Sequence, residues 1–233
     1  MICFACIAPH GDLEEIPILR SAMEELGRRF DAAGAETAIV VTPHNVHVEG
    51  HFAVVIAAQV GEWEVDRETA AALLQTNLPI LGVSFGGNMV EQAEMPLDWG
   101  TEVPLDFMRA KRVVVIAPAR DLSLDEHIWL GEAIAALPGR HALIASADHG
   151  HTHAADGPYG YHPASAAYDE LLQRILASDR LDFGPLADLV EDAKADSLWQ
   201  LLVLQGAIGE AGPADVLAYE AQSYFGMLVA ELS

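Results

Sequence analysis

Histidines are concentrated in one stretch of the chain, in the polar segment that follows an apolar run beginning at Ala142. This segment contains His149, His151, His153 and His162. The imidazole side chain has the unperturbed pKa nearest to neutrality, so histidines gathered beyond the end of a strand suit proton transfer or metal binding. A polar surface loop is the alternative interpretation of the same residues.

Two further histidines each follow a predicted strand. The apolar residues 2–8 lead into Pro9-His10, and residues 38–41 lead into Thr42-Pro43-His44. In open α/β sheets ligands bind in the crevice beyond the carboxyl ends of the strands, and parallel strands bring these ends to the same edge. A lone histidine is more often structural, but two at equivalent positions are predicted to converge on one crevice.

Predicted strands and helices alternate along most of the chain. Short apolar runs indicate strands near residues 2–8, 38–41, 51–59, 78–84, 112–117 and 142–147, whereas helical periodicity indicates helices near residues 12–33, 68–76, 121–138, 164–178, 183–193 and 196–208. Residues 216–219 and 227–232 predict a C-terminal β-hairpin. The pattern predicts an α/β fold with a mixed, mostly parallel central sheet and helices on both faces, in a single domain over residues 1–233.

Glycine and proline interrupt this pattern at two places. Gly100 and Pro104 lead us to expect no regular helix in residues 97–105. The pair Gly86-Gly87 predicts a flexible turn, because the lysine of a Walker A phosphate loop is missing.

The amino-acid composition argues against some classes of binding partner. Twelve basic against 35 acidic residues give a formal charge of −23, which would repel nucleic acid and anionic lipid surfaces. The sequence contains no apolar run long enough to span a bilayer and no basic segment typical of a signal peptide, so we expect a soluble, cytoplasmic protein. Cys3 and Cys6 fall within one predicted strand, where we expect two buried thiols rather than a dithiol site.

Four motifs, taken in order, resemble those of the class III extradiol ring-cleavage dioxygenases. They are Ala8-Pro-His10, Thr42-Pro-His44, Asp98-Trp-Gly-Thr-Glu-Val-Pro-Leu105 and Ser146-Ala-Asp-His-Gly-His151. This superfamily includes the LigB-type catalytic subunit of protocatechuate 4,5-dioxygenase, and the Memo-like proteins are related to it. No single motif is specific, but the ordered set is.

The resemblance implies a ligand set for non-haem iron(II). The two strand-end histidines of the family match His10 and His44, and the third ligand, a glutamate near the start of a late helix, has its nearest counterpart in Asp196, with Glu191 as the fallback. From the residues alone, Asp196 is equally well interpreted as the N-cap of that helix. Zinc is a possible substitute for iron, since it accepts the same ligand types.

The resemblance also implies roles in the rest of the site. The acid/base histidine of the family matches His151, while Trp99 stands where the family often has a histidine. Trp99, His149, Tyr161 and His162 are candidates for contact with an aromatic substrate, and Tyr159 lies beside them in the sequence. A strongly anionic substrate would need cations nearby, for which Arg109, Lys111 and Arg112 are the candidates.

The resemblance implies an oxidoreductase that opens a catechol-type ring with O2. The departures at Trp99 and Asp196 favour an alternative, a Memo-like metal-binding or redox-accessory protein that does not cleave rings, and a zinc hydrolase is a third interpretation. The expected partners are a small aromatic diol and O2, with no nucleic acid and no membrane. Association of identical chains, or a small partner subunit that completes the pocket, is left open.

Overall fold

A computed structural model describes residues 1–85, 89–209 and 212–232 of the chain. At the centre of its sheet lie four parallel strands, in the spatial order β1 (Ile2–Ala8), β9 (His141–Ser146), β2 (Thr37–Val41) and β8 (Arg112–Ala117). Their residues are almost all buried. Continuous apolar runs are expected of parallel strands, because helices cover both faces of such a sheet.

Antiparallel pairs extend the sheet on both sides. Beside β1 lie β11 (Met227–Leu232) and β10 (Asp215–Glu220), which form the C-terminal hairpin. Five shorter strands lie beyond β2 and around β8: β3 (Phe52–Val55), β4 (Gln59–Val60), β5 (Trp63–Val65), β6 (Ile80–Val83) and β7 (Glu94–Met95). The predicted mixed, mostly parallel sheet and the hairpin are thereby confirmed.

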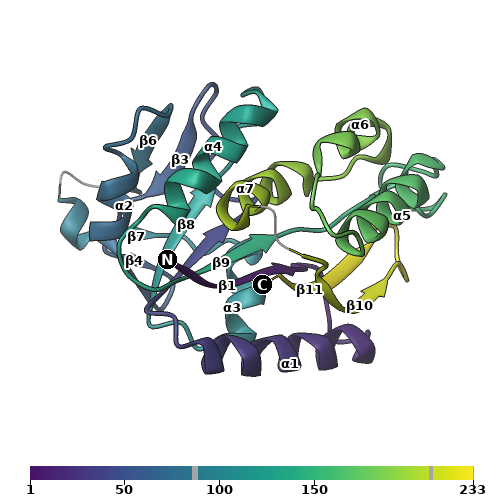
Figure 1. The fold of residues 1–233 in the computed structure, drawn as a ribbon, viewed down its shortest axis with the longest axis horizontal. Coiled ribbons are helices and arrows are strands. Elements are labelled where there is room, and N and C mark those ends of the chain that lie inside the picture. Colours follow the sequence, from purple (N-terminus) through teal and green to yellow (C-terminus); the bar gives the residue numbers. More distant parts are fainter. Residues whose placement is uncertain (86–88, 210–211, 233) are drawn as a thin grey trace.

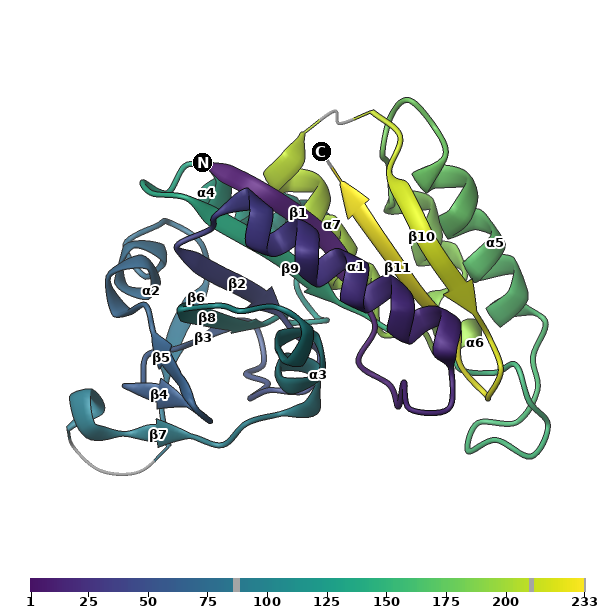
Figure 2. The same cartoon turned by 90° about the horizontal axis from the view of Figure 1, so that it is seen from below.

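Helices cover the two faces of the sheet and bury two separate apolar clusters (Figures 1 and 2). One face carries α1 (Pro17–Ala33) and α3 (Trp99–Phe107). The other carries α2 (Arg67–Leu73), α4 (Leu124–Ala135), α5 (Ala164–Leu176) and α7 (Leu198–Ile208). The short helices η1 (Val90–Gln92), η2 (Gly184–Asp188) and α6 (Val190–Ala193) lie in connecting segments.

The prediction that residues 97–105 contain no regular helix is wrong. Residues Trp99–Phe107 form α3 with Pro104 inside it, and Asp98 caps the helix by accepting a hydrogen bond from the backbone N–H of Thr101. A proline removes the N–H that would bond to the carbonyl four residues earlier. That carbonyl belongs to Gly100, and it instead accepts a hydrogen bond from the Ser146 hydroxyl at 2.5 Å.

Smaller differences concern the boundaries of elements. The helix predicted for residues 183–193 is divided into η2 and α6, and the strand predicted for residues 51–59 is divided into β3 and β4. Cys6 is buried and Cys3 partly buried, and both thiols are free. The turn predicted at residues 86–87 lies outside the described residues. Nowhere in the described part of the chain is there a helix with the length and apolar character needed to cross a bilayer.

Helices α4 and α7 are packed in unusually close contact at two glycines. A Cβ atom on Gly131 would overlap the Val203 carbonyl oxygen, and one on Gly206 would overlap the carbonyl of Ile128. Helix α7, which is apolar nearly all round, can therefore lie against both α4 and the sheet.

We predict that Gly206→Ala lowers the free energy of unfolding by about 1–3 kcal/mol, because the clash is with rigid backbone and outweighs the better helix propensity of alanine. Urea denaturation measures the change. Gly212→Ala is the matched control, since a Cβ there meets no atom within 4 Å. Equal losses in both variants would contradict this account of the packing.

Candidate metal centre and active site

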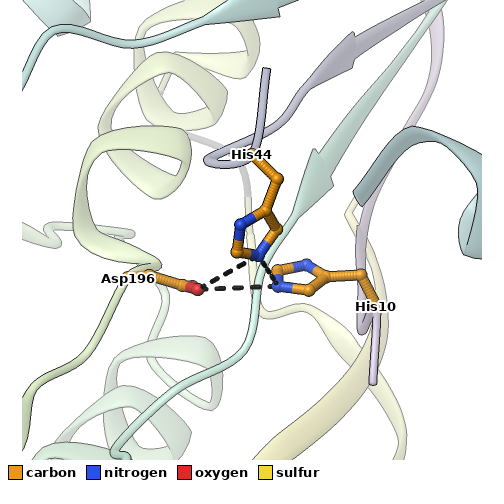
Figure 3. Close-up of side chains that lie close together, drawn as sticks. All are labelled: His10, His44 and Asp196. Carbon is orange, nitrogen blue, oxygen red and sulfur yellow. Dashed lines mark hydrogen bonds and ion pairs between the residues drawn. The ribbon is translucent and has the colours of Figure 1, made fainter. Parts of the chain in front are cut away.

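Three potential metal ligands meet at the edge of the sheet where the parallel strands β1 and β2 end, one on each side of β9 (Figure 3). His10 follows β1, His44 follows β2, and Asp196 precedes α7. The Nε2 atoms of the two histidines are 2.9 Å apart, and Asp196 Oδ2 lies 3.5 Å from His10 Nε2 and 3.8 Å from His44 Nε2. The convergence expected of the two strand-end histidines is therefore present.

The geometry of these donors suits a divalent metal ion. Ligand atoms about 2.1 Å from a metal at neighbouring octahedral positions are roughly 3 Å apart, close to the distances seen here. Two imidazoles and one carboxylate are also the ligand set of the non-haem iron facial triad. Glu191, the fallback ligand, is exposed on α6 and does not belong to the cluster.

A hydrogen-bond chain sets the tautomer of His10. The Ser146 hydroxyl donates its proton to the Gly100 carbonyl, so Ser146 Oγ must accept from His10 Nδ1, which lies 3.0 Å away. His10 Nδ1 is therefore protonated, and its Nε2 faces the cluster. Such outer partners orient ligating histidines in metal sites. The proline inside α3 thus contributes to the site, because it frees the carbonyl that orders Ser146.

Asp98 holds His44 in position. Its carboxylate accepts hydrogen bonds from the Thr42 hydroxyl and the Asn45 amide, both at 2.8 Å, on either side of His44. The ring of Trp99, the first residue of α3, lies 4.3 Å from the ring of His44. The N-terminus of α3 thereby fixes both the backbone and the imidazole ring at the end of β2.

The charges at the cluster favour a bound cation. Burial alone would lower the pKa of His10, but the carboxylates of Asp148 and Asp196 raise it to about 9. Burial and the charge on His10 lower the pKa of His44 to about 4. Burial opposes ionisation of Asp196, yet hydrogen bonding to His10 lowers the pKa of its carboxyl. Without metal, one proton shared by the two Nε2 atoms supplies the positive charge.

His151 faces the same cavity from the loop after β9. Its Nδ1 lies 2.6 Å from the carbonyl oxygen of His149 and must donate to it, which leaves Nε2 unprotonated in the neutral ring. The ring stacks on Phe225 at 5.4 Å between centroids. An imidazole with a fixed tautomer and a free Nε2 is suited to general base and acid catalysis.

Asp169 of α5 anchors the loop that carries His151. Its buried carboxylate accepts hydrogen bonds from the Gly150 N–H at 2.9 Å, from His153 Nε2 at 2.8 Å and from the Tyr219 hydroxyl at 2.7 Å. His153 is therefore engaged in holding the loop to α5 and β10.

A cavity of about 590 Å³ surrounds the cluster. Of the residues predicted to line a site, it includes the three ligands, His151, Trp99 and Tyr159. The structure does not bring the other three candidates into its lining. His149 is fully buried and bonded to Ser197, while Tyr161 and His162 are exposed. Burial lowers the pKa of His149 to about 4, so its imidazole is neutral.

Several lining residues were not identified from the sequence: Tyr224, Phe225, Arg120, Lys194 and Asp148 as a wall residue. Tyr224 and Phe225 lie in the turn of the C-terminal hairpin, which contacts the His151 ring. The sequence does show an aromatic pair in a predicted turn, but it does not show that this turn reaches the histidine loop. Asp148 accepts a hydrogen bond from the backbone N–H of His10 with one carboxylate oxygen, and its other oxygen lies 3.4 Å from His10 Nε2.

Comparison with known proteins finds relatives of this chain. A family model described as the catalytic LigB subunit of aromatic ring-opening dioxygenase matches residues 18–228, which include His44, His151 and Asp196. Protein CA_C1420 of Clostridium acetobutylicum is 23% identical over 237 residues, covering 90% of this chain, and the chain spans about half (51%) of that relative. The crystal structure of the uncharacterized protein JW3007 from Escherichia coli K12 has the same fold, with a TM-score of 0.69, 15% identity and 99% coverage of both chains.

We predict that metal binding releases about one proton per site near pH 7.5, because the ion replaces the proton held by His10. Since this proton is lost only near pH 9, affinity should rise about tenfold per pH unit between pH 7 and 9. Calorimetry with zinc, a redox-inert probe, in buffers of different ionisation enthalpy measures both quantities. His162→Asn, which alters an exposed histidine outside the cavity, is the control. Binding without proton release would contradict the charge balance.

Proposed function

Because the chain belongs to the LigB family of aromatic ring-opening dioxygenase catalytic subunits, we propose that it is an iron(II)-dependent extradiol dioxygenase that opens a catechol-type ring. The observation that carries this proposal is the His10, His44 and Asp196 cluster in one cavity with His151. In this proposal His10, His44 and Asp196 bind the metal ion, and His151 is the acid/base catalyst.

Bound iron(II) would supply coordination positions for the diol and O2 and the redox path that a singlet organic molecule otherwise lacks with triplet O2. His10, His44 and Asp196 are the residues that would hold it. The ring carbon–carbon bond beside the diol breaks, and both oxygen atoms of O2 enter the product, so the reaction consumes no net proton.

The protein's own part is to position the diol and move its protons. His151 Nε2 accepts a proton as the diol ionises and returns it as the ring opens. The hydrogen bond from Nδ1 to the His149 carbonyl stabilises the imidazolium formed in between. Trp99, Tyr159, Tyr224 and Phe225 provide aromatic surface around the ring. A histidine in this role typically contributes about 10²- to 10⁴-fold in rate.

Anaerobic reconstitution with iron(II), followed by addition of air and a panel of catechols, tests the proposal. We expect oxygen uptake matched one to one by yellow ring-opened product. His151→Gln should lower kcat about 10²- to 10⁴-fold with iron content unchanged, because it removes the proton acceptor but no ligand. His162→Gln is the matched control and should retain full activity. Iron uptake without oxygen consumption across the panel would refute ring cleavage.

A second candidate function is metal binding without ring cleavage, as in Memo-like relatives. The ring of Trp99, packed against the ring of His44, favours it, since tryptophan cannot replace the proton-transferring histidine often found there in the family. This second function predicts that the protein binds iron but takes up no oxygen, which is also the outcome that would refute ring cleavage.

A further inference from the structure

The turn of the C-terminal hairpin is hydrogen-bonded to the histidine-rich loop through its backbone. The His149 N–H donates to the Gly226 carbonyl at 2.8 Å, and the His153 N–H donates to the Tyr224 carbonyl at 3.0 Å. These two bonds come immediately before and after His151 in the sequence. The turn is therefore fixed relative to the residue to which the proposed function assigns proton transfer.

Phe225 projects from this turn onto the His151 ring. The two ring planes differ by 14° and their centroids are 5.4 Å apart, which is an offset stack. The rings of Tyr159 and Tyr224 are also close, but they are inclined to the imidazole by 82° and 50°. The hydrogen bond from His151 Nδ1 fixes one edge of the imidazole, and the Phe225 ring covers one of its faces.

Phe225 also lies against Gly11, the residue that follows His10. A Cβ atom on Gly11 would be 2.6 Å from Cε2 and 2.7 Å from Cζ of Phe225, and 2.9 Å from Met227 Sδ. Heavy atoms do not approach so closely, so the Phe225 ring occupies space that any side chain on Gly11 would need. Gly11 does not have a positive φ, and glycine is therefore required here by the close contact rather than by the backbone conformation.

Phe225 thus lies between the end of β1 and the loop after β9. The first of these segments carries the metal ligand His10, and the second carries His151. A change in the position of the Phe225 ring would alter how the imidazole of His151 lies relative to the metal cluster. Catalysis depends steeply on such placement, because an error of about 1 Å can lower a rate about a hundredfold.

We propose that Phe225 is a positioning residue, which fixes the His151 ring relative to the metal cluster by filling the space between Gly11 and His151. This inference rests on the proposed function, because it assumes that His151 moves the protons of a diol at the cluster. The role is distinct from contact with the substrate ring, since loss of that contact alone would raise KM and leave kcat unchanged.

A double-mutant cycle on the iron-loaded protein tests the role of Phe225. Gly11→Ala should lower kcat about tenfold to a hundredfold, because the new methyl group displaces the Phe225 ring. Phe225→Leu should lower kcat as well, and it removes the two ring atoms that the methyl group would meet. We therefore expect Gly11→Ala to change kcat less than about twofold when it is combined with Phe225→Leu. Gly212→Ala, where a Cβ meets no atom within 4 Å, is the control and should leave kcat unchanged.

NMR spectroscopy of the zinc-loaded protein tests the placement of His151 without turnover. Histidine-selective isotope labelling resolves the imidazole C–H signals, and His151→Gln identifies the signal of His151. The ring current of Phe225 acts on these protons, so the His151 signal should shift in both Gly11→Ala and Phe225→Leu. The signal of the exposed His162 should not shift, and the affinity for zinc should be unchanged in both variants.

Three results would overturn the positioning role. One is a His151 signal that does not shift in Gly11→Ala. Another is an equal loss of kcat from Gly11→Ala with and without Phe225→Leu, and the third is weaker zinc binding in Gly11→Ala, because each of these two would show that Gly11 acts through His10. Since zinc supports no ring opening, shifted His151 signals without oxygen uptake by the iron-loaded protein refute only the proposed function. Ring opening with kcat unchanged in Gly11→Ala refutes only the positioning role.

Discussion

Two imidazole nitrogens 2.9 Å apart, one from the buried His10 and one from the partly buried His44, are flanked by two carboxylates, and this is the constraint on which the rest of this structure depends. Ionisable groups so close together in a protein interior require a shared proton or a cation, because their charges are otherwise uncompensated. The surroundings hold these groups in place: Ser146 orients His10, and Asp98 fixes the loop around His44. A cation bound here accepts the lone pairs of these nitrogen and oxygen atoms, which the fold holds close together.

The sequence was sufficient for the parts of the site that follow strands. His10 and His44 each come directly after an apolar run, and parallel strands of one sheet end at the same edge, so the convergence of the two histidines could be predicted without coordinates. The role of α3 could not be predicted in this way. Pro104 indicates a break in a helix, and the structure tolerates it because Ser146, distant in sequence, bonds the freed carbonyl. That compensation is tertiary and has no local signal.

The histidine-rich loop shows the same limit. Its four histidines look equivalent in sequence, yet His149 is buried against Ser197, His151 faces the cavity and His153 binds Asp169, while His162 is exposed. Which ring faces inward depends on pairing of the loop with the C-terminal hairpin, where the Gly226 carbonyl accepts from the His149 N–H and the Gly150 carbonyl accepts from the Gly226 N–H. Such contacts between distant segments also explain why Arg120 and Lys194 were missed.

The position of β1 in the sheet has a consequence for how the protein is made. The first strand of the chain lies between β9 and β11, so its neighbours are residues 141–146 and 227–232. Contacts so distant along the chain form late and slowly. During synthesis His10 therefore leaves the ribosome well before β9, and β1 has no partner strand in the meantime. The nascent chain therefore cannot complete its ion-binding pocket until residues 141–232 have been made.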